Sequence, residues 1–479
     1  MKLGQTSVVY FFSKFGSSIA GFVATFYIAR MLGAEGYGIY ALALAVLAWL
    51  KIGGKIGVSS AITKRVSEGD EPDAYLVTGL AMMAGIFSIA AVAAIALRGP
   101  LESYIGAPVL SILLVLLAAE LFRAFTSAAL KGQHLVHVYA VLDPVNVTMR
   151  SALQIGVIAV GFGVGGLLAA YAFASIAIAL VSLFFVSVAL VRPTLRHAKS
   201  LFEYAKYAWL GNLKKMSFSW IDVTVLGLFV SQALVGVYSV AWSIAAVLTI
   251  FSKGISTTLF PEISKISAQE DPSQVSTLVT DAIRYNGLFM IPGLVGAALV
   301  GERILLIYGP EFVAGSSILL ILIAARTIYG YQKQLVNTIN GIDRPEIAFR
   351  INAVFVAVNV VLNVVLIWQY GWIGAAVATA LAAALTLVYA YYATCAFLEF
   401  DLPIQDVASQ CLAALLMGVV IYAMIVLGPP MEDSIVGHTT TVVIIGIGAL
   451  VYFLVLLSIS RTFRTTVSRN LPFDVPFAQ

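Results

Sequence analysis

Two lysines lie four residues apart in an otherwise apolar stretch, at positions Lys51 and Lys55. At helical spacing both side chains project from one face, one turn apart. A lysine that faced lipid at the centre of a bilayer would cost about 2.5–3.5 kcal/mol, so we expect both side chains to face protein or water. Ammonium groups held there could bind an anionic ligand.

The pattern returns about 198 residues later. Gly38-Ile39-Tyr40 recurs as Gly236-Val237-Tyr238, and the same offset carries Lys55 onto Lys253. Two equivalent lysines predict a duplicated, transporter-like bundle with a positively charged interior. An even number of helices in each half would relate the halves by an axis along the membrane normal.

Cations outnumber acids inside the predicted membrane spans, where we count twelve lysines and arginines against four acids, with Arg350 at the start of its span counted among the connecting segments. The spans therefore carry a net charge of +8, and the connecting segments carry −4. Ten of the cations are candidate substrate-binding residues: Lys14, Lys51, Lys55, Arg123, Arg150, Lys214, Lys215, Lys253, Arg326 and Lys333. Lys14, Lys55, Lys253 and Lys333 lie at similar depth, about 10–12 Å from one end of their helices, and could form a basic collar.

The acids within the predicted spans could have either a functional or a structural role. Glu120 and Asp222 are candidate coupling or gating acids, and Asp222 shares a helix face with Lys215. Glu120 also lies three residues before Arg123, so this pair could simply neutralise itself within one helix. Asp143, which precedes a proline, is expected to begin a helix.

Composition defines the elements that must position these residues. The chain of 479 residues is 61% hydrophobic and 11% charged, with a mean hydropathy of +0.97. These values are typical of an integral membrane protein. Apolar runs long enough to cross a bilayer as helices occur fourteen times: 7–29, 38–62, 75–97, 107–130, 138–161, 165–190, 204–230, 234–260, 275–300, 315–340, 347–369, 372–397, 407–427 and 437–459.

Loop charges predict the orientation of these spans. Thirteen lysines and arginines fall on the side of the N-terminus and three on the other side, so both termini should be cytoplasmic. The repeat divides the chain into a first six-helix lobe (1–200), a second lobe (201–400) and two further helices with a tail (401–479). The loops are too short for a soluble catalytic domain, and no Gly-x4-Gly-Lys-Ser/Thr motif for ATP hydrolysis occurs.

The segment from Ala29 to Tyr40, with sequence ARMLGAEGYGIY, resembles the signature turn of the oligosaccharide flippase (polysaccharide transporter) family. Further similar segments are Trp220-Ile221-Asp222, Val235 to Ala241 and Leu259 to Ser264. That family belongs to the multidrug/oligosaccharidyl-lipid/polysaccharide exporter superfamily. The resemblance implies a MATE-like fold, in which two six-helix lobes surround a central cavity that opens alternately to each side. It also implies transport of sugars linked to polyprenyl phosphate or pyrophosphate.

We therefore predict a flippase of the cytoplasmic membrane for a lipid-linked anionic oligosaccharide, serving cell-surface polysaccharide assembly or protein glycosylation. A cation-coupled multidrug exporter is the first alternative, although a basic interior disfavours cationic drugs. A membrane glycosyltransferase or glycan ligase is the second, although no Asp-x-Asp metal motif is recognised. We expect no enzymatic activity, cofactor, metal or nucleic acid partner. The expected partners are membrane lipids and, in the same pathway, glycosyltransferases, with the chain itself a monomer.

Overall fold

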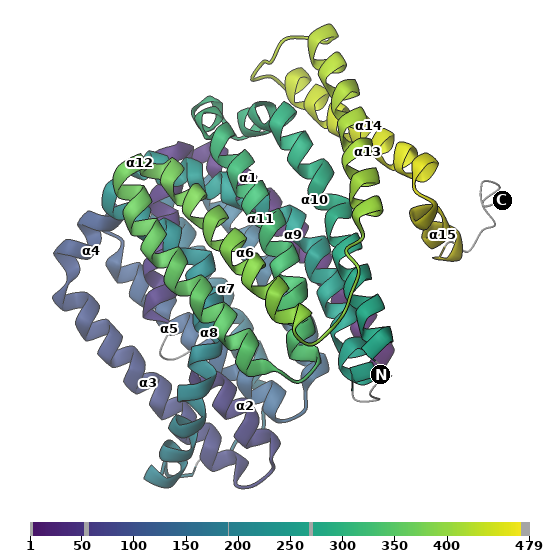
Figure 1. The fold of residues 1–479 in the computed structure, drawn as a ribbon. Helices are drawn as coiled ribbons and strands as arrows, with labels where there is room; N and C mark the ends of the chain where they lie inside the picture. The colour runs from purple at the N-terminus through teal and green to yellow at the C-terminus, as the bar shows by residue number, and fades with distance from the viewer. Residues whose placement is uncertain (1–2, 52–56, 190, 268–271, 471–479) are drawn as a thin grey trace. The chain divides into compact units, whose positions relative to one another are not determined.

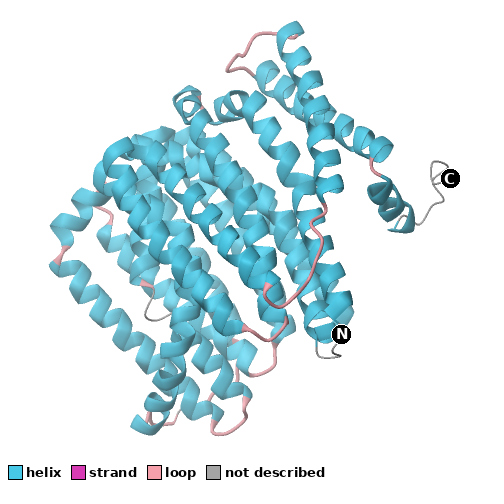
Figure 2. Cartoon of the chain, viewed as in Figure 1, coloured by secondary structure: helices cyan, strands magenta, loops and turns pink. Residues whose placement is uncertain are grey.

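The computed structural model describes residues 3–51, 57–189, 191–267 and 272–470. The side chains at 3–15, 207–215, 251, 253, 257, 258, 272, 469 and 470 are outside that description. Within the described residues the chain is built from helices joined by short connections, and Figure 2 shows no strand there. The predicted all-α membrane class is confirmed.

Contacts divide the chain into two compact units, Met1–Ser239 and Val240–Gln479, each of which has its own interior. In its described residues the first unit contains eight helices and the start of a ninth, labelled in Figure 1 where there is room. Its helices are α1 (Leu3–Leu50), α2 (Ser59–Ser67), α3 (Pro72–Ala96), α4 (Arg98–Ile105), α5 (Leu110–Gly132), α6 (Val136–Ala159), α7 (Gly163–Leu183) and α8 (Leu195–Phe229).

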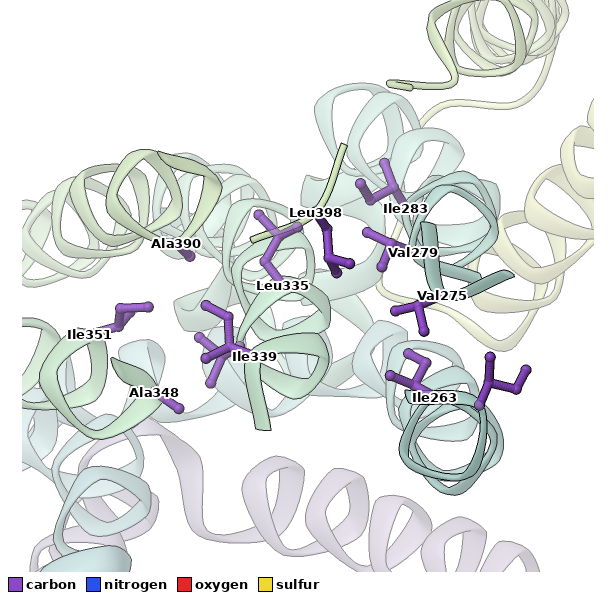
Figure 3. Close-up of a cluster of buried hydrophobic side chains, with 12 residues drawn as sticks. Ile263, Val275, Val279, Ile283, Leu335, Ile339, Ala348, Ile351, Ala390 and Leu398 are labelled. Atoms are coloured by element: carbon purple, nitrogen blue, oxygen red, sulfur yellow. The ribbon is translucent and has the colours of Figure 1, made fainter. Parts of the chain in front are cut away.

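The second unit contains most of α9 and the remaining helices. These are α9 (Gln232–Ser267), α10 (Pro272–Tyr308), the 3-10 helix η2 (Pro310–Gly315), α11 (Ser316–Gly341), α12 (Pro345–Cys395), α13 (Ile404–Leu427), α14 (Ile435–Ile459) and α15 (Arg461–Asn470). One of its apolar cores joins α9, α10, α11 and α12, with Leu335 and Ile339 of α11 among its buried members (Figure 3).

Two long elements bend at a glycine that marks a predicted span boundary. Gly33 in α1 has φ 69° and ψ 178°, and Gly371 in α12 has φ 58° and ψ −139°. Residues with a side chain rarely adopt such a positive φ, so glycine allows a sharp bend inside a continuous element. The bends separate the predicted spans 7–29 and 38–62, and the predicted spans 347–369 and 372–397.

Part of the predicted span 38–62, from 52 to 56, lies outside the described residues. α1 ends at Leu50, α2 begins at Ser59, and Lys51 lies in the turn that follows α1. Ten described helical segments are long and apolar enough to cross a membrane. The predicted number of fourteen spans and the boundaries of the three predicted domains stay predictions.

Candidate functional site

The carboxylate of Glu120, in the middle of α5, is fully buried and is bound by three donors. Lys51 Nζ lies 3.1 Å from Glu120 Oε2. Arg123 Nε donates to Glu120 Oε1 at 3.0 Å, and the Ser175 hydroxyl donates to the same oxygen at 2.9 Å. A buried charge is tolerated when it is both paired and hydrogen-bonded. The predicted pair within α5 is confirmed, and it has gained partners from α7 and from the end of α1.

The ion pairs continue from Glu120 to a second acid on α6. Arg123 Nη1 lies 3.9 Å from Asp143 Oδ1, and Lys131 Nζ lies 4.1 Å from the ring centroid of Tyr139. α6 begins at Val136, so Asp143 lies inside this helix and the prediction that it begins a helix was wrong. The helix continues through Pro144, because membrane helices tolerate proline where neighbouring groups satisfy the freed backbone.

On the other side of Glu120, a cation stacks on an aromatic ring. Arg150 Cζ lies 4.6 Å from the centroid of Tyr171, a distance at which the ring quadrupole attracts a guanidinium. The buried Nε of Arg150 makes no hydrogen bond within the described residues. One turn further along α6, Gln154 Nε2 donates to the hydroxyl of Tyr40 at 2.7 Å and to the carbonyl of Leu167 at 3.3 Å.

These contacts follow one face of α6. Tyr139, Asp143, Arg150 and Gln154 are spaced by four, seven and four residues, which places them on one side of a helix. Fifteen residues of helix extend for about 22 Å, most of the ~30 Å of a hydrocarbon core. A row of polar and charged groups therefore runs through the interior of the first unit.

We refer to six charged residues of this row as the ionic ladder: Lys131, Asp143, Arg123, Glu120, Lys51 and Arg150. Four are cations and two are acids, so the ladder has a net charge of +2. Four of its members were predicted site residues. The sequence reasoning missed the partners Ser175, Tyr171, Gln154 and Tyr40, although the spacing along α6 was a signal that could have revealed Gln154.

The second unit contains three of the predicted cations, and the two whose side chains are described, Arg326 and Lys333, both lie on α11. Arg326 is 8% exposed, and its Cζ lies 3.9 Å from the centroid of Trp242 on α9. Lys333 is half-buried seven residues later, so both side chains project from the same face of α11.

The carboxylate of Asp222 on α8 accepts a hydrogen bond from a tyrosine of α9. The Tyr238 hydroxyl donates to Asp222 Oδ2 at 2.6 Å, and both residues are buried. The side chain of Lys215, which was placed on the same helix face, lies outside the described residues, so the role of Asp222 as a gating acid stays a prediction.

The side chains of the remaining predicted cations are not described. Lys55 is not described, and the side chains of Lys14, Lys214, Lys215 and Lys253 are not described either. The basic collar therefore stays a prediction. Among the described residues no group of three or more His, Cys, Asp or Glu side chains could hold a metal ion.

Long apolar helices around a buried ionic row are the features of a multi-pass membrane protein. The sequence matches the family described as "Polysaccharide biosynthesis protein" over residues 27–315. The chain belongs to this polysaccharide biosynthesis family, which confirms the resemblance noted from its motifs.

Two curated relatives come from Haloferax volcanii. One is named "Probable flippase AglR" and is 30% identical over 478 residues, covering 98% of each chain. The other is named "Probable low-salt glycan biosynthesis flippase Agl15" and is 27% identical, covering 99% of this chain and all of the relative.

Solved structures support the fold. The lipid II flippase MurJ in an inward closed conformation superposes with a TM-score of 0.78 at 17% identity, covering 96% of this chain and all of MurJ. An inward-facing multidrug MATE transporter superposes with a TM-score of 0.65 at 16% identity, covering 79% and 95% of the two chains. The predicted MATE-like fold is confirmed.

Proposed function

We propose that this chain is a flippase that carries a lipid-linked oligosaccharide across the membrane by alternating access, without catalysing a chemical step. Membership of the family and the names of both Haloferax relatives support this function. We place the flippase in the cytoplasmic membrane, and the loop charges predict that both of its termini are cytoplasmic.

The observation that carries the proposal is the ionic ladder, because it offers cations to an anionic lipid head group. The side chains of Lys51 and Arg123 remain 15% and 12% exposed, whereas Glu120 between them is fully buried. Coulomb attraction between unit charges 4 Å apart is about 4 kcal/mol at an effective dielectric of 20, before desolvation is subtracted. A phosphate group could therefore replace Glu120 as the partner of these two cations.

In this mechanism Glu120 acts as the internal anion of the empty site. It neutralises Lys51 and Arg123 when no ligand is present, and it competes with the phosphate when a ligand arrives. The guanidinium of Arg150 stacks on the ring of Tyr171, and its charge adds positive potential at the same site. The excess of cations disfavours a cationic drug as the ligand.

The function is tested by reconstitution. Proteoliposomes loaded with a polyprenyl-pyrophosphate-linked glycan should expose that glycan to a membrane-impermeant glycosidase faster than protein-free vesicles do. Equal rates with and without protein would contradict a flippase.

The assigned roles are tested by binding of a short-chain polyprenyl phosphate to the purified chain. Lys51→Gln should weaken binding at least tenfold because a cation is lost. Glu120→Gln should tighten binding because a competitor is lost. Changes of the same sign in both variants would contradict an internal competitor.

A further inference from the structure

Two glycines of the repeated motif face each other across a helix crossing in the first unit. A Cβ atom at Gly38 of α1 would overlap the backbone oxygen of Gln232 and lie 3.0 Å from the backbone nitrogen of Gly236. A Cβ atom at Gly236 of α9 would overlap the backbone oxygen of Ala34 and lie 2.9 Å from the backbone nitrogen of Gly38. The two backbones are in contact, and a methyl group on either would force them apart.

The contact is reciprocal. Ala34 precedes Gly38 by four residues, as Gln232 precedes Gly236. Each glycine therefore faces the carbonyl one turn before the other, which is the arrangement that a two-fold axis produces when equivalent surfaces meet. These glycines are equivalent positions of the 198-residue repeat, so the two copies of the motif pack against each other.

The tyrosine two residues after each glycine is anchored to a different helix. Tyr40 accepts a hydrogen bond from Gln154 of α6, and Tyr238 donates one to Asp222 of α8. The two tyrosines therefore bind different helices, and the two glycines themselves meet through close packing of their backbones.

Neighbouring segments crowd the same end of the bundle. A Cβ at Gly106, which follows α4 and has φ +88°, would lie 2.9 Å from Gln232 Nε2. The Tyr104 hydroxyl of α4 donates to the carbonyl of Thr224 near the end of α8 at 2.8 Å. In the topology predicted from the loop charges, these connections all lie on the side opposite the termini.

We propose that the reciprocal contact of Gly38 and Gly236 is the external seal of the transporter, closed in this structure and opened once in each transport cycle. The proposal rests on alternating access and on the predicted orientation, and it does not depend on the identity of the substrate. Glycine is needed at both positions because only the closed state brings the backbones together. Alanine at either position should therefore shift the conformational equilibrium toward the open state, because the substitution disfavours only the closed one.

The test uses the full chain in proteoliposomes, with Cys395→Ser and Cys411→Ser to remove the two exposed native thiols. Ala34→Cys reports on the seal, since this position is 6% exposed. Labelling by a membrane-impermeant maleimide from the external side should be slow with both glycines present and at least tenfold faster in Gly38→Ala and in Gly236→Ala. The matched control is Gly156→Ala, because a Cβ at Gly156 meets no atom within 4 Å, and it should leave the rate unchanged.

A second reporter separates opening from unfolding. Ala61→Cys replaces a fully buried residue of α2 and should stay unreactive in both alanine variants. If it becomes reactive too, the glycines are required for folding and the seal is refuted. An unchanged labelling rate at position 34 would also refute the seal. No substrate is added, so either result stands apart from the outcome of the flippase assay.

Discussion

Replacing Glu120 by glutamine removes the only acid that the described structure places between Lys51 and Arg123. The isosteric amide keeps the shape of the side chain but leaves two cations 3.1 and 3.0 Å from a neutral group. Removing one partner of a buried ion pair typically costs 3–5 kcal/mol, because the remaining charge stays desolvated. We expect the Glu120→Gln variant to lose about 3 kcal/mol or more of unfolding free energy.

The matched control is a pair on the surface. Arg98 Nε lies 3.2 Å from Glu102 Oε2, and these side chains are 58% and 19% exposed. Exposed pairs contribute about 0.2–1 kcal/mol, so Glu102→Gln should change stability little. Unfolding of the purified protein in mixed micelles, followed by circular dichroism, measures both variants. Losses that agree within about 0.5 kcal/mol would refute the claim that the ionic ladder is a desolvated network.

Three further predictions concern other parts of the chain. The hydrogen bond from His197, together with the charge of Arg196, holds the pKa of Glu71 below its ordinary value of 4.5. The ionised Glu71 carboxylate therefore contributes its full stabilisation of the fold above pH 4.5, and this stabilisation is lost as the pH falls further. The free energy of unfolding, measured as a function of pH, should show this loss in the wild type and not in Glu71→Gln. The same pH dependence in both proteins would contradict a stabilising role of the Glu71 carboxylate. Tyr238→Phe removes the hydroxyl that donates to buried Asp222 and should cost about 1–3 kcal/mol of unfolding free energy; a neutral effect in the same unfolding assay would show that this hydrogen bond does not stabilise the fold. A cysteine at either terminus should be labelled only from the cytoplasmic side, and external labelling would overturn the orientation.

Local patterns in the sequence predicted much of the fold. Apolar runs located the helices, and the bends at Gly33 and Gly371 fell where the runs were expected to separate. The pair formed by Glu120 and Arg123 followed from a spacing of three residues within one helix. Each of these features is determined by residues close together in the chain.

Features that depend on helix packing were not predictable in this way. Lys51 and Glu120 are 69 residues apart, and no local pattern indicates which face of α5 meets the end of α1. The reciprocal packing of Gly38 and Gly236 has the same origin, since the repeat shows that they are equivalent but not that they touch. Asp143 was misplaced because proline was treated as a helix start, a rule that membrane helices relax.

The most direct test of the central claim compares translocation of one glycan on two lipid carriers, a polyprenyl phosphate and a neutral polyprenol, in proteoliposomes. The wild type should translocate the phosphate-linked glycan at least tenfold faster than the neutral one. The double variant Lys51→Gln/Arg123→Gln should lose that preference, because the two cations that lie beside Glu120 in the empty site are gone. An undiminished preference in the double variant would show that the ionic ladder does not recognise the phosphate, and would contradict the mechanism proposed for this chain.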